Sequence, residues 1–312
     1  MGWILSYKNI NIDLIWKKIL ICLVFGCIVV SFIIFYQGFI GPPSWLNYFL
    51  PGDATFQSKG TVAERAFRSA RYTGIFSSPL EAGLYMSVGL LLSAYLVVNN
   101  YKKILGYYGL IFISFGGLMS VSKVMIVGII LTVLFLLWNL KKRNYLKICF
   151  IFIFFSLLVF ILNTIYLDYF EPLKNIQKYY PWNWNEDTDV LKLLTAKRFS
   201  NNEEGTLIIK FRENPMIFGG GFRNYGTVDS AFLEVWLIGG VIGLLLLSLI
   251  LIYPIYKGWR NKKFIDGKLM FFLGLLFTIA SIGAPAITKN RVSIVYFIIL
   301  SVLIFLIHKK KD

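Results

Sequence analysis

Charged residues, histidine and cysteine are all scarce in this chain of 312 residues. Asp, Glu, Lys and Arg together make up 15% of it, hydrophobic residues make up 57%, and the single histidine is His308. This composition excludes an ordinary soluble domain. The three cysteines all lie in apolar runs, which argues against a disulfide framework or a thiolate metal site. One histidine in a lysine-rich tail leaves no imidazole for the rest of the chain, so neither a metal nor a cofactor is expected.

Long apolar runs are abundant instead. A helix that rises about 1.5 Å per residue needs roughly 20 residues to cross the hydrocarbon of a membrane. The runs lack the alternation of barrel strands, so helices are expected to span the bilayer. The sequence predicts an all-α fold, a polytopic transmembrane bundle forming a single domain over 1–312. Eight spans are expected near 19–40, 79–98, 104–119, 121–138, 148–166, 230–254, 269–287 and 292–307.

Lysine and arginine collect in the short loops 99–103, 139–147 and 257–268, and at both ends of the chain. Because such loops stay in the cytoplasm, both termini are expected there, in a multi-pass protein of the cytoplasmic (inner) membrane. The eight spans then leave 41–78 and 167–229 as long outer loops. The net charge of +16 is mainly a topology signal. It also suits membrane lipid with anionic headgroups, and no nucleic-acid partner is expected.

The first long loop carries three arginines at a spacing of three residues. Gly and Pro at 41–43 should end the first span, and AERAFRSARYTG predicts a short helix with Arg65, Arg68 and Arg71 on one face. A solvated basic helix fits this pattern. A phosphate clamp fits it too, because the planar guanidinium stays charged and donates in pairs to phosphate oxygens.

The second long loop mixes aromatic residues with charges. Its first part is typical of an aromatic belt at the headgroups, with stacking on sugar rings as the alternative. Further on, EEGTLIIKFREN predicts an amphipathic surface helix that brings Arg198 and Arg212 close to the membrane. The glycines 219–221 fit either a flexible turn or an anion-binding backbone nest. Gly239 and Gly243 are expected to allow close helix packing.

Three charged side chains fall at membrane depth. Glu81 and Glu234 lie near the outer ends of two expected spans. Carboxylates there usually face a cavity or a cation, so a functional role and a structural ion pair with arginine are both open. Lys123 follows a short turn that is expected below the headgroups. Its partner would be a diphosphate or one of these carboxylates, unless the side chain snorkels to the surface.

Several of these pieces, in this order, resemble the O-antigen ligase and Wzy-type polysaccharide polymerase superfamily. Arg198, then NPMIFGGGF, then DSAFLEVWLIGGVIG look like its C-terminal signature, while RYTGIFSSPLEAG and MSVSKVMIVG look like two upstream motifs. The likeness covers roughly residues 70 to 250. Fewer spans than usual precede the first long loop, so the chain resembles a compact member or one that lacks N-terminal spans.

The resemblance implies glycosyl transfer outside the cytoplasmic membrane, from an undecaprenyl-diphosphate-linked oligosaccharide to a sugar hydroxyl. Ligases of the family place histidine where this chain has Asp229, which favours a polymerase of repeat units, working with a possible chain-length regulator protein. Transfer to another acceptor by a ligase, or transport by a flippase, are the alternatives.

The resemblance also suggests a role for each charged residue. Arg198 and Arg71 would stabilise the leaving diphosphate, and Asp229 would act as the base. Further groups that would contact the substrate are Arg212, Arg223, Lys123, Arg68, Glu234 and Glu81.

Overall fold

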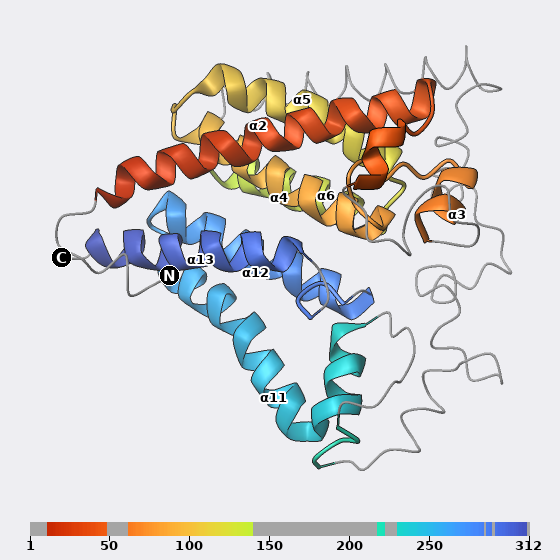
Figure 1. The fold of residues 1–312 in the computed structure, drawn as a ribbon. Helices are drawn as coiled ribbons and strands as arrows, with labels where there is room; N and C mark the ends of the chain where they lie inside the picture. Colours follow the sequence, from red (N-terminus) through yellow and green to blue (C-terminus); the bar gives the residue numbers. More distant parts are fainter. Residues whose placement is uncertain are drawn as a thin grey trace, which may run out of the picture.

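The structure, a computed structural model, describes residues 11–48, 62–139, 217–221, 230–283, 285–288 and 291–310. All the regular elements in these ranges are helices (Figure 1). Five are long and apolar enough to cross a membrane: α2 (Ile12–Phe39), α4 (Pro79–Val98), α11 (Ala231–Arg260), α12 (Ile265–Gly283) and α13 (Val292–Lys309). Two shorter apolar helices are α5 (Lys103–Met119) and α6 (Lys123–Asn139). The chain is a helical membrane protein.

The predicted spans correspond closely to these helices, apart from 148–166, which lies outside the described residues. Helix α4 covers 79–98 as expected. Helix α2 begins earlier than expected, at Ile12, because the side chain of Asn11 caps it by accepting from the amide of Leu14. The span placed at 269–287 was too late in the chain, since α12 covers Ile265–Gly283 and 286–288 form a turn. A total of eight spans is not confirmed.

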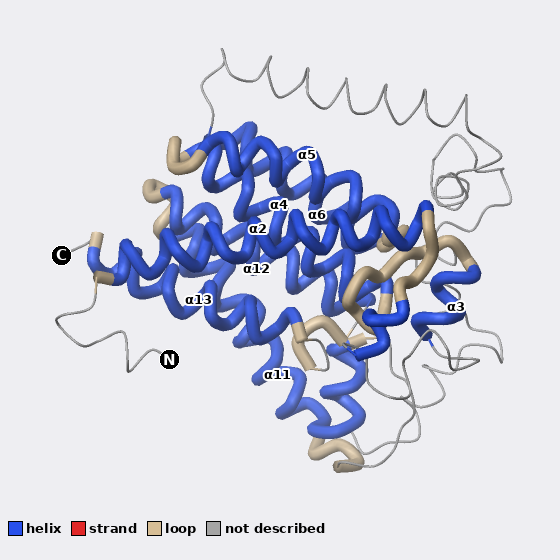
Figure 2. Tube along the Cα trace, turned by 45° about the horizontal axis from the view of Figure 1, so that its top comes forward, coloured by secondary structure: helices blue, strands red, loops and turns tan. Residues whose placement is uncertain are grey.

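Helices α2, α4, α5 and α6 form a tightly packed group in which small residues meet across the contacts (Figure 2). A Cβ atom on Gly116 of α5 would lie 2.7 Å from Cβ of Ser31 in α2. One on Gly128 of α6 would overlap Ser87 of α4. The hydroxyl of Ser31 donates along its own helix to the carbonyl of Cys27 at 2.9 Å, and that of Ser87 is shared between the carbonyls of Gly83 of α4 at 2.7 Å and Val124 of α6 at 3.2 Å. Backbones can therefore approach closely, as in membrane bundles generally.

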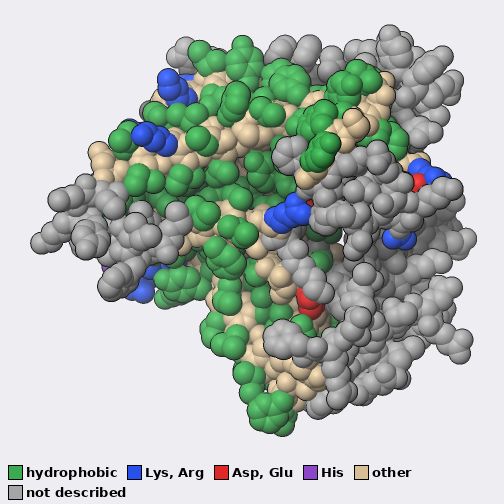
Figure 3. Space-filling model, in the orientation of Figure 1, with side chains coloured by type: hydrophobic (Ala, Val, Ile, Leu, Met, Phe, Trp, Pro, Cys, Tyr) green, Lys and Arg blue, Asp and Glu red, His purple; other side chains and the backbone are tan. Residues whose placement is uncertain are grey.

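The two ends of the bundle differ in charge. Helix α2 begins and α13 ends at the same end (Figure 1). We call this the lysine-rich end, and the opposite one, where α4, α6, α11 and α13 begin, the carboxylate end. Figure 3 shows hydrophobic side chains covering most of the described face, with charged ones mainly toward the ends. The described lysines and arginines of the lysine-rich end are Lys17, Lys18, Lys102, Lys103, Lys257, Arg260, Lys262, Lys263, Lys268, Lys309 and Lys310.

Helix α11 is broken at Gly240, where the backbone turns to φ 57° and ψ −148°. The break frees two carbonyls on its N-terminal side. The amide of Gly220 donates to the carbonyl of Leu237 at 2.7 Å, and that of Gly221 to Ile238 at 3.1 Å. Buried backbone groups in a membrane need such partners. These amides hold a broken helix and do not form an anion nest.

Among the described residues, neither neighbouring glycine is seen in the packing role expected of it. A Cβ atom on Gly239 would meet no atom of the described residues within 4 Å, and one on Gly243 would meet Val235 of the same helix. The close approach is at Gly240, where a Cβ atom would overlap the carbonyl of Ile217. Within the part of the chain that the structure describes, the glycine cluster therefore shapes α11.

Candidate functional site

Two buried carboxylates mark the carboxylate end. Glu81 lies in the first turn of α4 and Glu234 in the first turn of α11, and each side chain is only 5% exposed. Both helices start at a serine N-cap: Ser78 accepts from the amide of Glu81 at 3.2 Å, and Ser230 from that of Leu233 at 3.5 Å. Acidic residues are common in the first turn of a helix, where the helix dipole is positive.

Both carboxylates hold the connection between α12 and α13, of which the structure describes residues 285–288 and 291. The backbone amide of Arg291 donates to Oε1 of Glu81 at 3.3 Å. The hydroxyl of Thr288 donates to Oε2 of Glu234. Glu81 also accepts from the hydroxyl of Ser77 at 3.0 Å. The α12–α13 connection is thus fastened to α4 by one glutamate and to α11 by the other.

The segment 71–78 is fixed against α2 and α5. The side chain of Gln37, which is 1% exposed, donates to the carbonyl of Gly74 at 3.1 Å and accepts from its amide at 2.9 Å. Gly74 has φ +61°, and a Cβ atom there would crowd α2, so glycine is required. The amide of Tyr72 donates to the carbonyl of Met119 at 3.1 Å. These bonds set the position of Arg71, whose side chain is partly buried.

Lys123 begins α6, directly after a tight turn. Val121 in that turn has φ +48°, an uncommon value for a β-branched residue. Gly83 of α4 touches the turn, because a Cβ atom on it would overlap Ser122. Lys123 and Glu81 therefore lie on neighbouring elements at the carboxylate end, and Lys123 is partly buried.

One expectation for the first long loop was wrong. Helix α3 covers only Val62–Arg68, and Ala70 has φ +50°, which ends it. Arg71 therefore lies beyond the helix and does not share a face with Arg65 and Arg68. Arg68 forms an ion pair with Glu64 within α3, and its side chain is 70% exposed.

The predicted site residues are therefore only partly brought together. Glu81 and Glu234 meet at one connection, and Arg71 and Lys123 lie on segments at the same end. Arg198, Arg212, Arg223 and Asp229 lie outside the described residues.

The sequence did not lead us to predict two residues of this arrangement, Thr288 and Arg291. The signal that could have found them is a short polar connection between two apolar helices, because its donors must be satisfied near the membrane. Arg291 adds a cation to the carboxylate end. The described part of that end therefore combines Arg71, Lys123 and Arg291 with two buried carboxylates. Within the described residues no group of three His, Cys, Asp or Glu side chains is placed to hold a metal ion.

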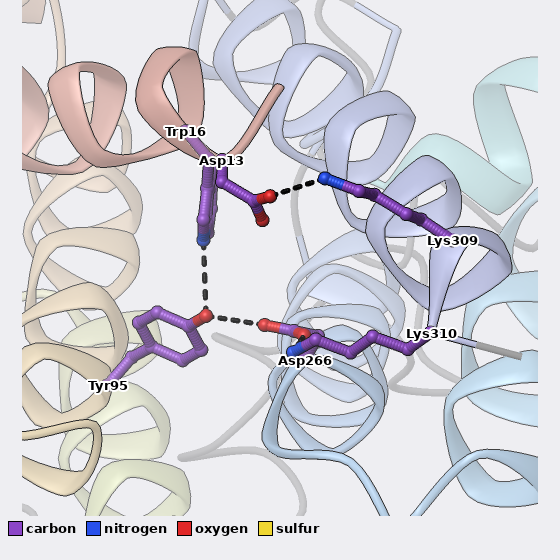
Figure 4. Close-up of polar contacts among 6 residues, drawn as sticks. All are labelled: Asp13, Trp16, Tyr95, Asp266, Lys309 and Lys310. Carbon is purple, nitrogen blue, oxygen red and sulfur yellow. Dashed lines mark hydrogen bonds and ion pairs between the residues drawn. The ribbon is translucent and has the colours of Figure 1, made fainter. Parts of the chain in front are cut away.

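A second polar cluster, also missed, lies at the lysine-rich end (Figure 4). The hydroxyl of Tyr95 donates to Asp266, which is 1% exposed, and accepts from the indole of Trp16 at 3.1 Å. Lys310 pairs with the other oxygen of Asp266. Nearby, Lys309 pairs with Asp13 at 2.6 Å. These bonds join α2, α4, α12 and α13, and all the groups are satisfied, so the cluster is structural.

Comparison with protein-family models, with curated proteins and with solved structures finds no match to this chain. The likeness to the ligase and polymerase superfamily therefore depends on the residues quoted above.

Proposed function

We propose that this protein is a membrane glycosyltransferase that polymerises undecaprenyl-diphosphate-linked oligosaccharide repeat units outside the cytoplasmic membrane. The proposal includes eight spans, with the lysine-rich end in the cytoplasm and the carboxylate end outside. It rests on the resemblance of residues 70 to 250 to the polymerase branch of the superfamily. The supporting observation is the pair of buried glutamates at one connection, at the end where Arg71, Lys123 and Arg291 also lie.

The cations suit the leaving group of this reaction. The bond that breaks joins the anomeric carbon of the growing glycan to a lipid diphosphate, and the diphosphate departs with the bonding electrons. Fixed cations in a site of low dielectric stabilise the charge that develops there. Arg71 is held by the Gln37–Gly74 hydrogen bonds, so its backbone position costs no reorganisation when the substrate binds. Arg198 is the second principal cation in the proposal.

The carboxylates suit the other half of the reaction. The acceptor hydroxyl attacks the anomeric carbon and loses its proton, which a positioned carboxylate can take. Asp229 is the proposed base, directly ahead of the N-cap of α11. Glu234 and Glu81 would orient the acceptor or serve as the base in its place.

The clamp is tested by replacing Arg71 and by a matched change nearby. In cells that depend on this protein for a surface glycan, Arg71→Ala should reduce long chains to single repeat units, with protein level and topology unchanged. Arg65→Ala, an exposed arginine of α3, should leave chain length as it is. Normal chains from Arg71→Ala at normal protein level would remove Arg71 from the site.

The base is tested in proteoliposomes that contain a polyprenyl-diphosphate oligosaccharide. Asp229→Asn should lower turnover by about 100-fold or more with little change in donor binding, because general base catalysis contributes that much. Turnover like that of the unchanged protein would remove Asp229 as the base and leave Glu234→Gln and Glu81→Gln as the next variants to assay.

A flippase for lipid-linked oligosaccharides is the second candidate, and the broken helix α11 favours it. Transporters often use interrupted helices with exposed backbone near their sites. The two functions differ in what accumulates when the gene is deleted. A missing polymerase leaves single repeat units on the outer leaflet, whereas a missing flippase leaves them on the cytoplasmic leaflet, which leaflet-resolved labelling distinguishes.

A further inference from the structure

An aromatic cluster at the lysine-rich end joins α6, α11 and α12. Trp138, near the end of α6, and Trp259, near the end of α11, have ring centroids 5.7 Å apart. Phe271 of α12 lies 5.9 Å from Trp138 and 5.5 Å from Trp259. Both indoles remain partly open, with Trp138 38% and Trp259 49% exposed. Indole rings at the ends of spanning helices are typical of the headgroup level of a bilayer.

Two lysines lie on this cluster. The ammonium of Lys262 is 4.3 Å from the ring centroid of Trp259, and that of Lys268 is 5.6 Å from that of Trp138. Lys268 also donates to Oδ1 of Asn139 at 2.9 Å. Since the two indoles contact each other, both positive charges are held at one aromatic surface.

The cations around this surface have only neutral partners within the described residues. Lys257 donates to the phenol of Tyr253 at 2.8 Å, and Arg260 to that of Tyr256 at 3.5 Å. The ion pairs at this end involve other lysines: Lys309 occupies Asp13 and Lys310 occupies Asp266. Lys262 and Lys268 therefore lie on the Trp138–Trp259 pair with no carboxylate partner among the described residues. An external anion would complete this arrangement.

We infer that the Trp138–Trp259 pair, with Lys262 and Lys268, binds the headgroup of an anionic phospholipid. The neighbouring face of α11 carries Ile252, Tyr256 and Trp259 at 56%, 59% and 49% exposure, so an acyl chain can lie along the helix below the headgroup. Basic pockets between spanning helices bind acidic lipids through this combination of cations and apolar surface. The lipid would join the end of α6 to the α11–α12 turn. This inference is independent of the proposed enzymatic activity.

The test uses the full chain and native mass spectrometry after titration with phosphatidylglycerol or phosphatidylcholine of identical acyl chains. The unchanged protein should retain phosphatidylglycerol in preference to phosphatidylcholine. The double variant Lys262→Gln/Lys268→Gln should bind phosphatidylglycerol roughly 30-fold more weakly, because each lysine near a headgroup contributes about a fivefold factor. The matched control is Lys102→Gln/Lys103→Gln, two exposed lysines of the same end on the α4–α5 turn. It should retain the lipid.

Each other result overturns the inference. Equal losses in both double variants would mean that diffuse surface charge attracts the lipid. Equal retention of the two lipids would mean that the headgroup is not recognised. If inorganic phosphate without lipid raised the unfolding temperature as much as phosphatidylglycerol does, the site would be a simple anion site. If the double variant does not fold, the single variants Lys262→Gln and Lys268→Gln decide, because each removes one of the two cations and should weaken phosphatidylglycerol retention about fivefold.

Discussion

Helices α4 and α11 are both apolar enough to span a membrane, but their surroundings differ. In the most apolar stretch of each, 89% of α4 is buried against other helices and only 22% of α11. Helix α4 packs on α2, α5 and α6 through small residues, whereas among the described helices α11 packs mainly on α12. Lipid tails solvate leucine as well as a protein does, so apolar character alone does not decide which helix is central.

The difference shows how each helix deals with its backbone. Helix α4 is regular, and its glycines serve only to let neighbours approach. Helix α11 contains a break that is stable because Gly220 and Gly221 supply donors to the carbonyls of Leu237 and Ile238. Close packing thus keeps one helix regular, and local hydrogen bonds allow the other to be irregular.

The largest effect is expected where the packing is closest. Gly128→Leu places a side chain where even a Cβ atom overlaps Ser87, so the free energy of unfolding should fall by about 3 kcal/mol. Gly239→Leu on α11, where no described residue lies within 4 Å of the added Cβ atom, should change it by less than about 1 kcal/mol. Denaturation in lipid nanodiscs measures both. Similar losses for the two variants would contradict the contrast between the helices.

The break in α11 should respond to a single methyl group. Gly240→Ala demands a left-handed conformation that costs a non-glycine residue about 1–3 kcal/mol, besides the overlap with Ile217. The helix should straighten in response. Spin labels at Leu233→Cys and Leu249→Cys, in a background without native cysteines, should then approach a separation of about 24 Å, that of 16 residues in a straight helix. An unchanged, shorter distance would show that the break does not depend on Gly240.

A smaller effect is expected at the contact that joins α4 to α12. Asp266→Ala leaves the hydroxyl of Tyr95 without its acceptor in a buried position, which should cost about 2 kcal/mol of unfolding free energy. Asp13→Ala removes an ion pair in which both side chains are about half exposed, and should cost less than about 1 kcal/mol. Thermal unfolding of the two variants compares them directly, and equal losses would mean that Asp266 is not the stronger attachment.

The smallest effect is expected from a packed serine. The hydroxyl of Ser93 donates to the carbonyl of Gly89 in its own helix at 2.7 Å, so it makes no bond to a neighbour. Ser93→Ala should change stability by no more than about 0.5 kcal/mol. A loss above 2 kcal/mol would show that polar contacts, and not small size, hold α4 and α5 together.

The ends of a helix could be predicted from the sequence wherever a hydrophobic run met a capping residue, a glycine or a proline. The limits of α4 follow from Ser78 and Pro79, which cap and start it, and α2 ends at Phe39 before the glycine and prolines of 41–43. The break at Gly240 could not be predicted, because it depends on donors from residues 217–221 that only the folded chain brings there.

The sequence could predict which residues belong to the candidate site, but not which groups they contact. Glu81 and Glu234 stand out in the sequence as carboxylates at membrane depth. That both hold the α12–α13 connection depends on how three separate helices pack, which no local pattern encodes. The arginine spacing in the first long loop led to a wrong prediction of a shared face. A three-residue period indicates a shared face only while the helix continues, and the helix ends at Ala70.

The ion pair between Lys309 and Asp13 can form only after Lys309 has been synthesised, which makes it a late step of folding. The two residues are 296 positions apart, and chains emerge from the ribosome with their N-terminal part first. Asp13 therefore enters the membrane long before its partner Lys309 exists. The group of α2, α4, α5 and α6 can assemble during synthesis, and closure of α2 against α13 is a late, post-insertion step.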